Sequence, residues 1–193
     1  MEGVGQVIVL LLSLALAFLI YDTYVVGNVE YVKSTVDGRD YLVQSLPDKQ
    51  QAADLLARIG ANLKKLVAHL EKMVPDDPRT VRIVQNFNPD ALTEGTDNTR
   101  YTSYSINKGE KIVFCLRARD GSKKLEDLNM MMFVAIHELG HIGTEEVGHT
   151  PTFWTNFKWL LEHAIDIGVY QKYDFAAKPK EYCGMMVKSN VLD

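Results

Sequence analysis

The chain has 193 residues, enough for one domain with a substantial hydrophobic core, and it contains no internal repeat or low-complexity tract. Its 21 Lys and Arg residues are outnumbered by 25 Asp and Glu residues, which gives a formal net charge of -4. Such a chain has no net positive field to attract phosphates. Composition therefore argues against binding to nucleic acid through charge, and we expect no nucleic-acid partner.

The N-terminal segment, residues 1–26, is predicted to be a transmembrane anchor. No charged residue lies between Glu2 and Asp22, and this uncharged stretch of 19 residues could cross a hydrocarbon core of about 30 Å. A signal peptide would need a basic start, but the first Lys or Arg is Lys33. A buried core helix would show an amphipathic face. We expect a single-pass membrane protein in contact with the lipid bilayer, with residues 27–193 as a domain on the cytoplasmic side.

A β-hairpin is predicted directly after this segment. Residues 29–36 alternate weakly between apolar and polar side chains, and residues 41–43 begin a second strand. Between them, Asp37 and Gly38 form a strong two-residue turn signal.

A long helix is predicted next. Apolar side chains repeat at helical spacing from residue 52 to residue 73, Asp48 is the expected N-cap, and Pro75 ends the pattern. We expect this helix to pack against the sheet as a scaffold. Residues 86–101, rich in Asn, Asp, Thr and Gly, are predicted to be a loop at the rim of a cleft.

The two cysteines, Cys115 and Cys183, are interpreted as free thiols in a reducing environment. Cys115 lies among apolar neighbours of a predicted strand, where a thiol behaves as a small hydrophobic side chain. The two could form a disulfide only if the fold brings them together.

Residues 137–149 read His-Glu-Leu-Gly-His-Ile-Gly-Thr-Glu-Glu-Val-Gly-His and are the most informative segment. On a helix, this spacing puts His137 and His141 on one face, so both imidazoles can reach one Zn²⁺ ion. Glu138 is placed to take a proton from a water that the metal activates. Alternatively, these side chains are core residues with ordinary hydrogen bonds, but a near-continuous apolar helix makes that costly. We predict a zinc site with Glu138 as general base.

A catalytic zinc ion usually has three protein ligands and one position for water. We predict His149 as the third ligand, because Gly148 marks a turn and a Thr-Pro pair typical of a helix start follows directly. The alternatives are Glu145, Glu146 and His163. The two glutamates read as the edge of a polar loop, and His163 as a surface or core residue of the next helix.

The segment HELGHIGTEEVGHTPTFW, residues 137–154, is similar to the active-site segment of the WLM and SprT-like metallopeptidases. Phe153 and Trp154 stand where that family has an aromatic pair at the start of the next helix. Residues 105–117 resemble the WLM segment that ends in an apolar strand before the metal helix. The resemblance covers residues 101–165 and implies an α+β, zincin-like domain in which a small mixed sheet packs on helices. It also implies a strand along the cleft edge that binds a peptide substrate as an added strand.

The last predicted helix runs from Pro151 to about Tyr170 and covers the metal helix from behind. Tyr173 and Tyr182 lie in the tail that follows. Of these tyrosines, Tyr182 is our candidate donor to the oxyanion that develops during peptide hydrolysis.

The predicted function is therefore membrane-anchored, zinc-dependent hydrolysis of a protein or peptide substrate. The segment from Val29 to Leu70 resembles WLM-like proteins of large DNA viruses. The alternative is a membrane-anchored structural protein, such as a minor capsid or virion membrane component, that contacts capsid or other membrane proteins and requires no proteolysis. Glu138 favours catalysis, because a purely structural zinc site needs no base.

Overall fold

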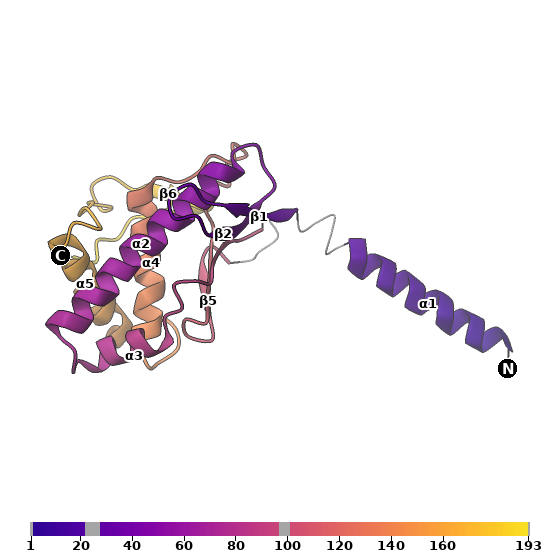
Figure 1. Cartoon of the computed structure of the whole chain (residues 1–193), viewed down its shortest axis with the longest axis horizontal. Helices are drawn as coiled ribbons and strands as arrows, with labels where there is room; N and C mark the ends of the chain where they lie inside the picture. The colour runs from indigo at the N-terminus through magenta and orange to yellow at the C-terminus, as the bar shows by residue number, and fades with distance from the viewer. Residues whose placement is uncertain (1, 22–27, 97–100, 193) are drawn as a thin grey trace.

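The computed structural model of the chain describes residues 2–21, 28–96 and 101–192. The helices in these residues are α1 (Glu2–Tyr21), α2 (Lys49–Met73), α3 (Pro78–Asn86), α4 (Leu128–Gly143) and α5 (Pro151–Asp166). The strands are β1 (Val29–Lys33), β2 (Asp40–Gln44), β3 (Leu92–Glu94), β4 (Tyr104–Ile106), β5 (Lys111–Phe114), β6 (Lys180–Tyr182) and β7 (Met185–Val187). Figure 1 shows α2 to α5 gathered on one side of β1, β2 and β5, with α1 apart from them.

The central sheet is small and mixed, as the resemblance to the WLM and SprT-like metallopeptidases implies. Its strand order is β3-β5-β4, with β3 parallel and β4 antiparallel to β5. Ile112 of β5 faces Leu92 on one side and Ser105 on the other. Two antiparallel hairpins, β1–β2 and β6–β7, complete the β-structure of the described residues. The apolar strand β5 is thus central, and β4 is an edge.

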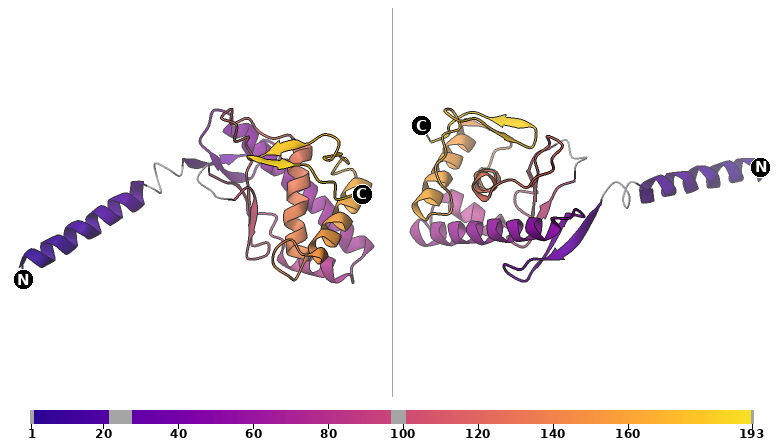
Figure 2. Two further views of the ribbon diagram at one scale, coloured as in Figure 1. Left: turned by 180° about the vertical axis from the view of Figure 1, so that it is seen from behind. Right: turned by 90° about the horizontal axis from the view of Figure 1, so that it is seen from above.

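Helix α4 runs through the core. Helices α2, α3 and α5 pack against it, and β4 contacts it as well. Figure 2 shows α4 enclosed by these elements when the molecule is seen from above. Helix α2 contributes a stripe of fully buried side chains at helical spacing: Leu56, Ile59, Leu63, Leu66 and Leu70. Burial of each such side chain stabilises the fold by roughly 1.5–3 kcal/mol, so α2 is the scaffold helix that the sequence predicts.

Two glycines let neighbouring helices approach α4 closely. A Cβ atom on Gly140 would lie 3.2 Å from Cε2 of Phe153 in α5, and one on Gly143 would lie 3.0 Å from Cδ1 of Ile83 in α3. Both separations are tighter than ordinary contact, so α4 lies nearer to its neighbours here than a side chain would allow.

The predicted hairpin is confirmed, but α3 and β3 are among the elements that were missed. The β1–β2 hairpin forms around Gly38, which has a positive φ of 74°. Helix α3 was not predicted, although Asp77 accepts a hydrogen bond from Arg79 N and Pro78 follows at the first helical position. Strand β3 lies inside the predicted loop of residues 86–101, of which residues 97–100 are outside the described residues.

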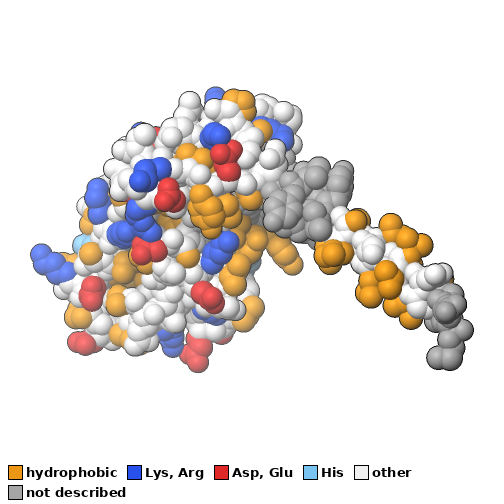
Figure 3. Space-filling view, turned by 45° about the vertical axis from the view of Figure 1, so that its right-hand side comes forward, with side chains coloured by type: hydrophobic (Ala, Val, Ile, Leu, Met, Phe, Trp, Pro, Cys, Tyr) orange, Lys and Arg blue, Asp and Glu red, His pale blue; other side chains and the backbone are white. Residues whose placement is uncertain are grey.

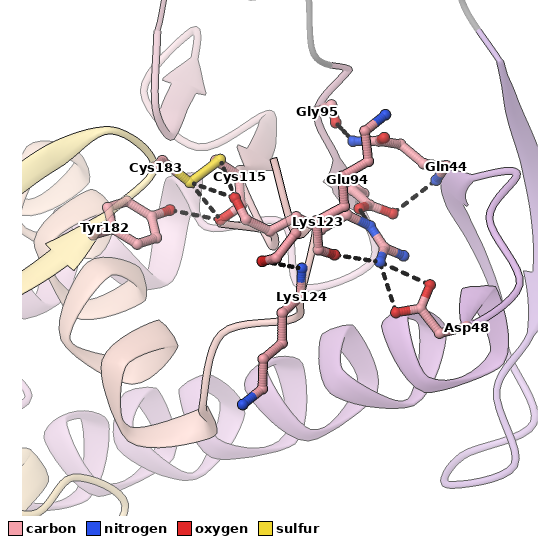
Figure 4. Close-up of polar contacts among 11 residues, drawn as sticks. Gln44, Asp48, Glu94, Gly95, Cys115, Lys123, Lys124, Tyr182 and Cys183 are labelled. Carbon is pink, nitrogen blue, oxygen red and sulfur yellow. Dashed lines mark hydrogen bonds and ion pairs between the residues drawn. A yellow bond between two sulfur atoms is a disulfide. The ribbon is translucent and has the colours of Figure 1, made fainter. Parts of the chain in front are cut away.

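Arg117 joins elements that are distant in sequence. Its guanidinium is buried, and Nε donates to Oε1 of Glu94 at 2.6 Å. Its Nη1 donates to both carboxylate oxygens of Asp48, each at 2.7 Å. Glu94 also accepts from the backbone N–H of Gln44 at 2.7 Å, as Figure 4 shows. Asp48 precedes α2 as predicted, but its side chain makes no capping hydrogen bond, because the carboxylate binds Arg117 instead.

The predicted transmembrane anchor at residues 1–26 is wrong, and so is the single-pass membrane localisation. In the residues that the structure describes, no helix is both long and apolar enough to cross a bilayer. Figure 3 shows hydrophobic side chains exposed along α1. The predicted domain boundary at residue 26 lies outside the described residues.

The prediction of two free thiols is also wrong. Cys115, just after β5, and Cys183, just after β6, form a disulfide with a Cα–Cα distance of 6.4 Å (Figure 4). The two residues are 68 positions apart, so no local pattern brings them together. The disulfide attaches the C-terminal hairpin to the end of the central strand.

We expect Arg117→Met to lower the free energy of unfolding by about 3–5 kcal/mol, because it leaves the buried carboxylate of Glu94 without its cation. Urea denaturation followed by circular dichroism measures the change. The matched control is Arg39→Met, which breaks an exposed ion pair with Asp90 and should cost no more than about 1 kcal/mol. Equal losses in the two variants would contradict this role of Arg117.

We expect replacement of Cys115 and Cys183 together by serine to cost roughly 4 kcal/mol, because the cross-link closes a loop with a sequence separation of 68 residues. Thermal unfolding with and without reductant tests this. The Tm of the wild type should fall in reductant, whereas that of the double serine variant should not change. A wild-type Tm that is the same with and without reductant would refute the expectation.

Candidate metal centre

Three histidine side chains converge on one point. Nε2 of His137 lies 3.2 Å from Nε2 of His141 and 2.9 Å from Nε2 of His149. One ring nitrogen from each of the three lies within 4.8 Å of the other two. Nitrogens at about 2.0–2.1 Å from one tetrahedral zinc ion would be about 3.3 Å apart, so the donor set and its spacing fit zinc. The structure thus brings together the three residues that the sequence names as ligands.

The protonation states of the two helix histidines suit a metal. Burial, with the nearby imidazoles of His141 and His149, lowers the pKa of His137 to about 3. Burial, with His149 and Lys108, lowers the pKa of His141 to about 4. Both rings are therefore neutral near pH 7, and a neutral imidazole keeps a lone pair for a metal ion.

The start of α5 supplies aromatic support for the imidazoles. Thr150 caps the helix by accepting from Phe153 N at 3.2 Å, and proline follows at the first helical position, as predicted. This start places the Phe153 ring in a stack on His141, with centroids 4.3 Å apart, and the Trp154 ring in a stack on His149 at 5.6 Å. The predicted aromatic pair thus orients two of the three histidines.

Glu138 lies beside the histidines in a buried position. Its side chain is only 4% exposed, and the backbone N–H of Ser105 in β4 donates a hydrogen bond to the carboxylate. Burial raises the pKa of Glu138 to about 7, against the effect of that hydrogen bond. A carboxylate with this pKa can both accept and return a proton near neutral pH.

A cleft of about 950 Å³ opens over the histidines and Glu138. One wall comes from β4 and the residues before it, and another from Met185, Met186 and the residues that follow them in the C-terminal segment. The sequence predicts an edge strand along the cleft within residues 105–117. The apolar strand there, β5, is central, and the strand of this sheet that is both an edge and part of the cleft wall is β4.

The alternative third ligands lie elsewhere. Glu145 pairs with Arg82 at 2.9 Å, and Glu146 accepts a hydrogen bond from Thr152 at 2.9 Å. His163 Nδ1 lies 3.1 Å from Nε2 of His69, and neither residue is part of the cleft lining described above. Each of these three side chains therefore has a partner outside the histidine cluster.

Tyr182 lines the cleft, but its hydroxyl already has partners. Its Oη donates to the carbonyl oxygen of Cys115 at 2.9 Å and lies 2.6 Å from Oγ of Ser103. Burial raises the pKa of Tyr182, so the hydroxyl stays protonated. A role for Tyr182 as an oxyanion donor would require this hydroxyl to leave Cys115.

Sequence reasoning missed the C-terminal wall of the cleft and Lys108 at its rim. Strands β6 and β7 have three residues each, which is too short for an alternating pattern to stand out. The sequence signal that could have been used is Gly184, because glycine is typical of turns, and it does occupy one here with a φ of 79°.

No family model matches the chain. Uncharacterized protein R325 of Acanthamoeba polyphaga mimivirus is 33% identical over 170 residues, covering 86% of this chain and 86% of that protein. Uncharacterized protein 136R of Invertebrate iridescent virus 6 is 29% identical over 188 residues, covering 92% of this chain and 96% of that protein. Among solved structures, Wss1 from Saccharomyces cerevisiae has a TM-score of 0.49 and 23% identity, covering 65% of this chain and 86% of that chain.

We expect His149→Ala to weaken zinc binding by more than the roughly 10- to 100-fold that follows loss of an outer-shell partner, because it removes a donor nitrogen. Competition with a chromophoric chelator measures the Kd. Glu145→Ala and Glu146→Ala are the matched controls from the same loop and should leave the Kd unchanged. A glutamate variant that binds zinc as weakly as His149→Ala would show that the third ligand is misassigned.

Proposed function

The chain belongs to a family of viral proteins that includes uncharacterized protein R325 of Acanthamoeba polyphaga mimivirus, and we propose that it is a zinc-dependent metallopeptidase. The observation that carries the proposal is the meeting of three imidazole nitrogens and a buried carboxylate in one cleft. The resemblance of residues 137–154 to the WLM and SprT-like metallopeptidases agrees with it.

His137, His141 and His149 would hold the ion. When bound, zinc lowers the pKa of a water and polarises a carbonyl, which are the two effects that peptide hydrolysis needs. Glu138 takes the proton from the attacking water and returns it to the leaving amine. The hydrogen bond from Ser105 N–H holds its carboxylate in place for both transfers.

The walls of the cleft favour an extended polypeptide as substrate. Strand β4 has β5 on one side only, so a peptide can add to its other side through main-chain hydrogen bonds. Because Ser105 of this strand contacts Glu138, an added strand would lie directly beside the proposed base. Apolar side chains of Trp154, Met185 and Met186 line the cleft and would receive apolar side chains of the substrate.

We expect Glu138→Gln to retain zinc but to lower the rate of cleavage by about 10²- to 10⁴-fold, because glutamine cannot accept the proton. The assay follows zinc content together with cleavage of an unfolded fluorescent polypeptide. Glu162→Gln, an exposed change on α5, should leave both unchanged. Wild-type protein that binds zinc but cleaves no unfolded substrate would refute the enzyme and leave a structural metal site.

A further inference from the structure

The ammonium group of Lys108 lies at the C-terminal end of α4 among four carbonyl oxygens. Its Nζ donates to the backbone oxygens of Thr144 at 2.6 Å, Glu146 at 2.9 Å, Glu145 at 3.2 Å and His141 at 3.3 Å. The last carbonyls of a helix have no partner within the helix and carry its negative dipole end. A lysine ammonium has three donors, so this one binds the helix end and the loop after it together.

The backbone around Lys108 is shaped to aim the side chain at this point. Asn107 and Lys108 have positive φ angles of 47° and 56°, which are uncommon for residues other than glycine. Gly109 follows with a φ of 117°, and a Cβ atom there would lie 2.6 Å from the carbonyl oxygen of Asn86. The turn is therefore pressed against the end of α3. Unfavourable backbone angles of this kind persist only where other contacts hold them, and they gather at functional sites.

The loop that Lys108 binds is the one that carries His149. Its first residue is well fixed, since Thr144 Oγ1 donates to the carbonyl of Gly140 at 2.7 Å and accepts from Asn156 at 2.9 Å. Beyond Glu146 the loop is open to solvent: Val147 is 87% exposed, and His149 is exposed as well. The path of residues 144–146 therefore decides where the chain leaves α4 and whether His149 can turn back to His137.

We propose that Lys108 is a positioning residue for the third histidine. By binding the carbonyls of residues 141 and 144–146, its ammonium fixes the loop so that His149 meets the two histidines of α4. The Trp154 ring, stacked on His149, holds the other end of the same loop. This inference rests on the proposed zinc site. It adds a residue at the rim of the cleft that is not itself one of the proposed zinc ligands.

The test measures zinc affinity of the full chain, by chelator competition, for Lys108→Met, His149→Ala and the double variant. Lys108→Met keeps the length and apolar stem of the side chain and removes the donors, so the Kd for zinc should rise by about 10- to 100-fold. Because Lys108 acts through His149, the double variant should bind zinc no more weakly than His149→Ala alone. Lys111→Met is the matched control, three residues further along the same hairpin and outside the described cleft lining, and should leave the Kd unchanged.

A second readout follows the coordination itself. The visible absorption of bound Co²⁺ reports coordination geometry, and the spectrum of Lys108→Met should shift toward that of His149→Ala. Should Lys108→Met unfold, Lys108→Gln, with two amide hydrogens, replaces it in the same pair of comparisons.

Two outcomes overturn the inference while the proposed function stands: wild-type zinc affinity in Lys108→Met, or effects of Lys108→Met and His149→Ala that multiply in the double variant. Multiplying effects would mean that Lys108 stabilises the domain without acting through His149. A wild-type chain that binds no zinc would overturn the inference and the proposed function together.

Discussion

The burial of α4 is the constraint on which the rest of the structure depends. This helix carries two histidines and a glutamate through the core, and such groups are costly in an apolar interior. Helices α2, α3 and α5 cover its other faces, and Gly140 and Gly143 let α5 and α3 come close enough to do so. The two histidines and the glutamate of α4 therefore face the cleft, the side that these helices leave uncovered. The same burial lowers the pKa of His137 and raises that of Glu138. The packing of α4 therefore also sets the protonation states of these side chains.

The third histidine, His149, lies on an exposed loop, so burial in the core does not fix its position. Its position comes from contacts made by its neighbours: the Trp154 ring against the imidazole, the capped start of α5 behind it, and the Lys108 ammonium on the carbonyls before it. Metal sites commonly depend on such outer groups as much as on the ligands themselves. Two histidines of the cluster are therefore held by the packing of α4, and the third is held by contacts at both ends of its loop.

The parts that sequence predicts best are those whose signal is local. Helix α2, the histidine pair of α4 and the Thr-Pro start of α5 each follow from spacing within one element or from a cap. The parts that were missed depend on contacts between distant segments. Asp48 reads as a helix cap until Arg117 is seen beside it, and the Cys115–Cys183 disulfide joins residues 68 positions apart. The short strands were a second difficulty, because a strand of three residues is too short to show periodicity. The apolar N-terminal segment was a third, because it was interpreted as a membrane span, which the described helix does not support.

Cys115 shows how the two walls of the cleft are tied together. It follows β5, the strand that pairs with β4, so its backbone belongs to the sheet side of the cleft. Its sulfur is bonded to Cys183, its carbonyl accepts from Tyr182, and its N–H donates to Ser103 Oγ, which also contacts Tyr182. The C-terminal wall is thus held to the sheet by one covalent bond and a short hydrogen-bonded chain (Figure 4). None of these contacts passes through α4, whereas the histidines depend on α4 and on the loop after it. The sheet side of the cleft and the histidine cluster meet instead at the turn between β4 and β5, where Lys108 binds the loop that carries His149.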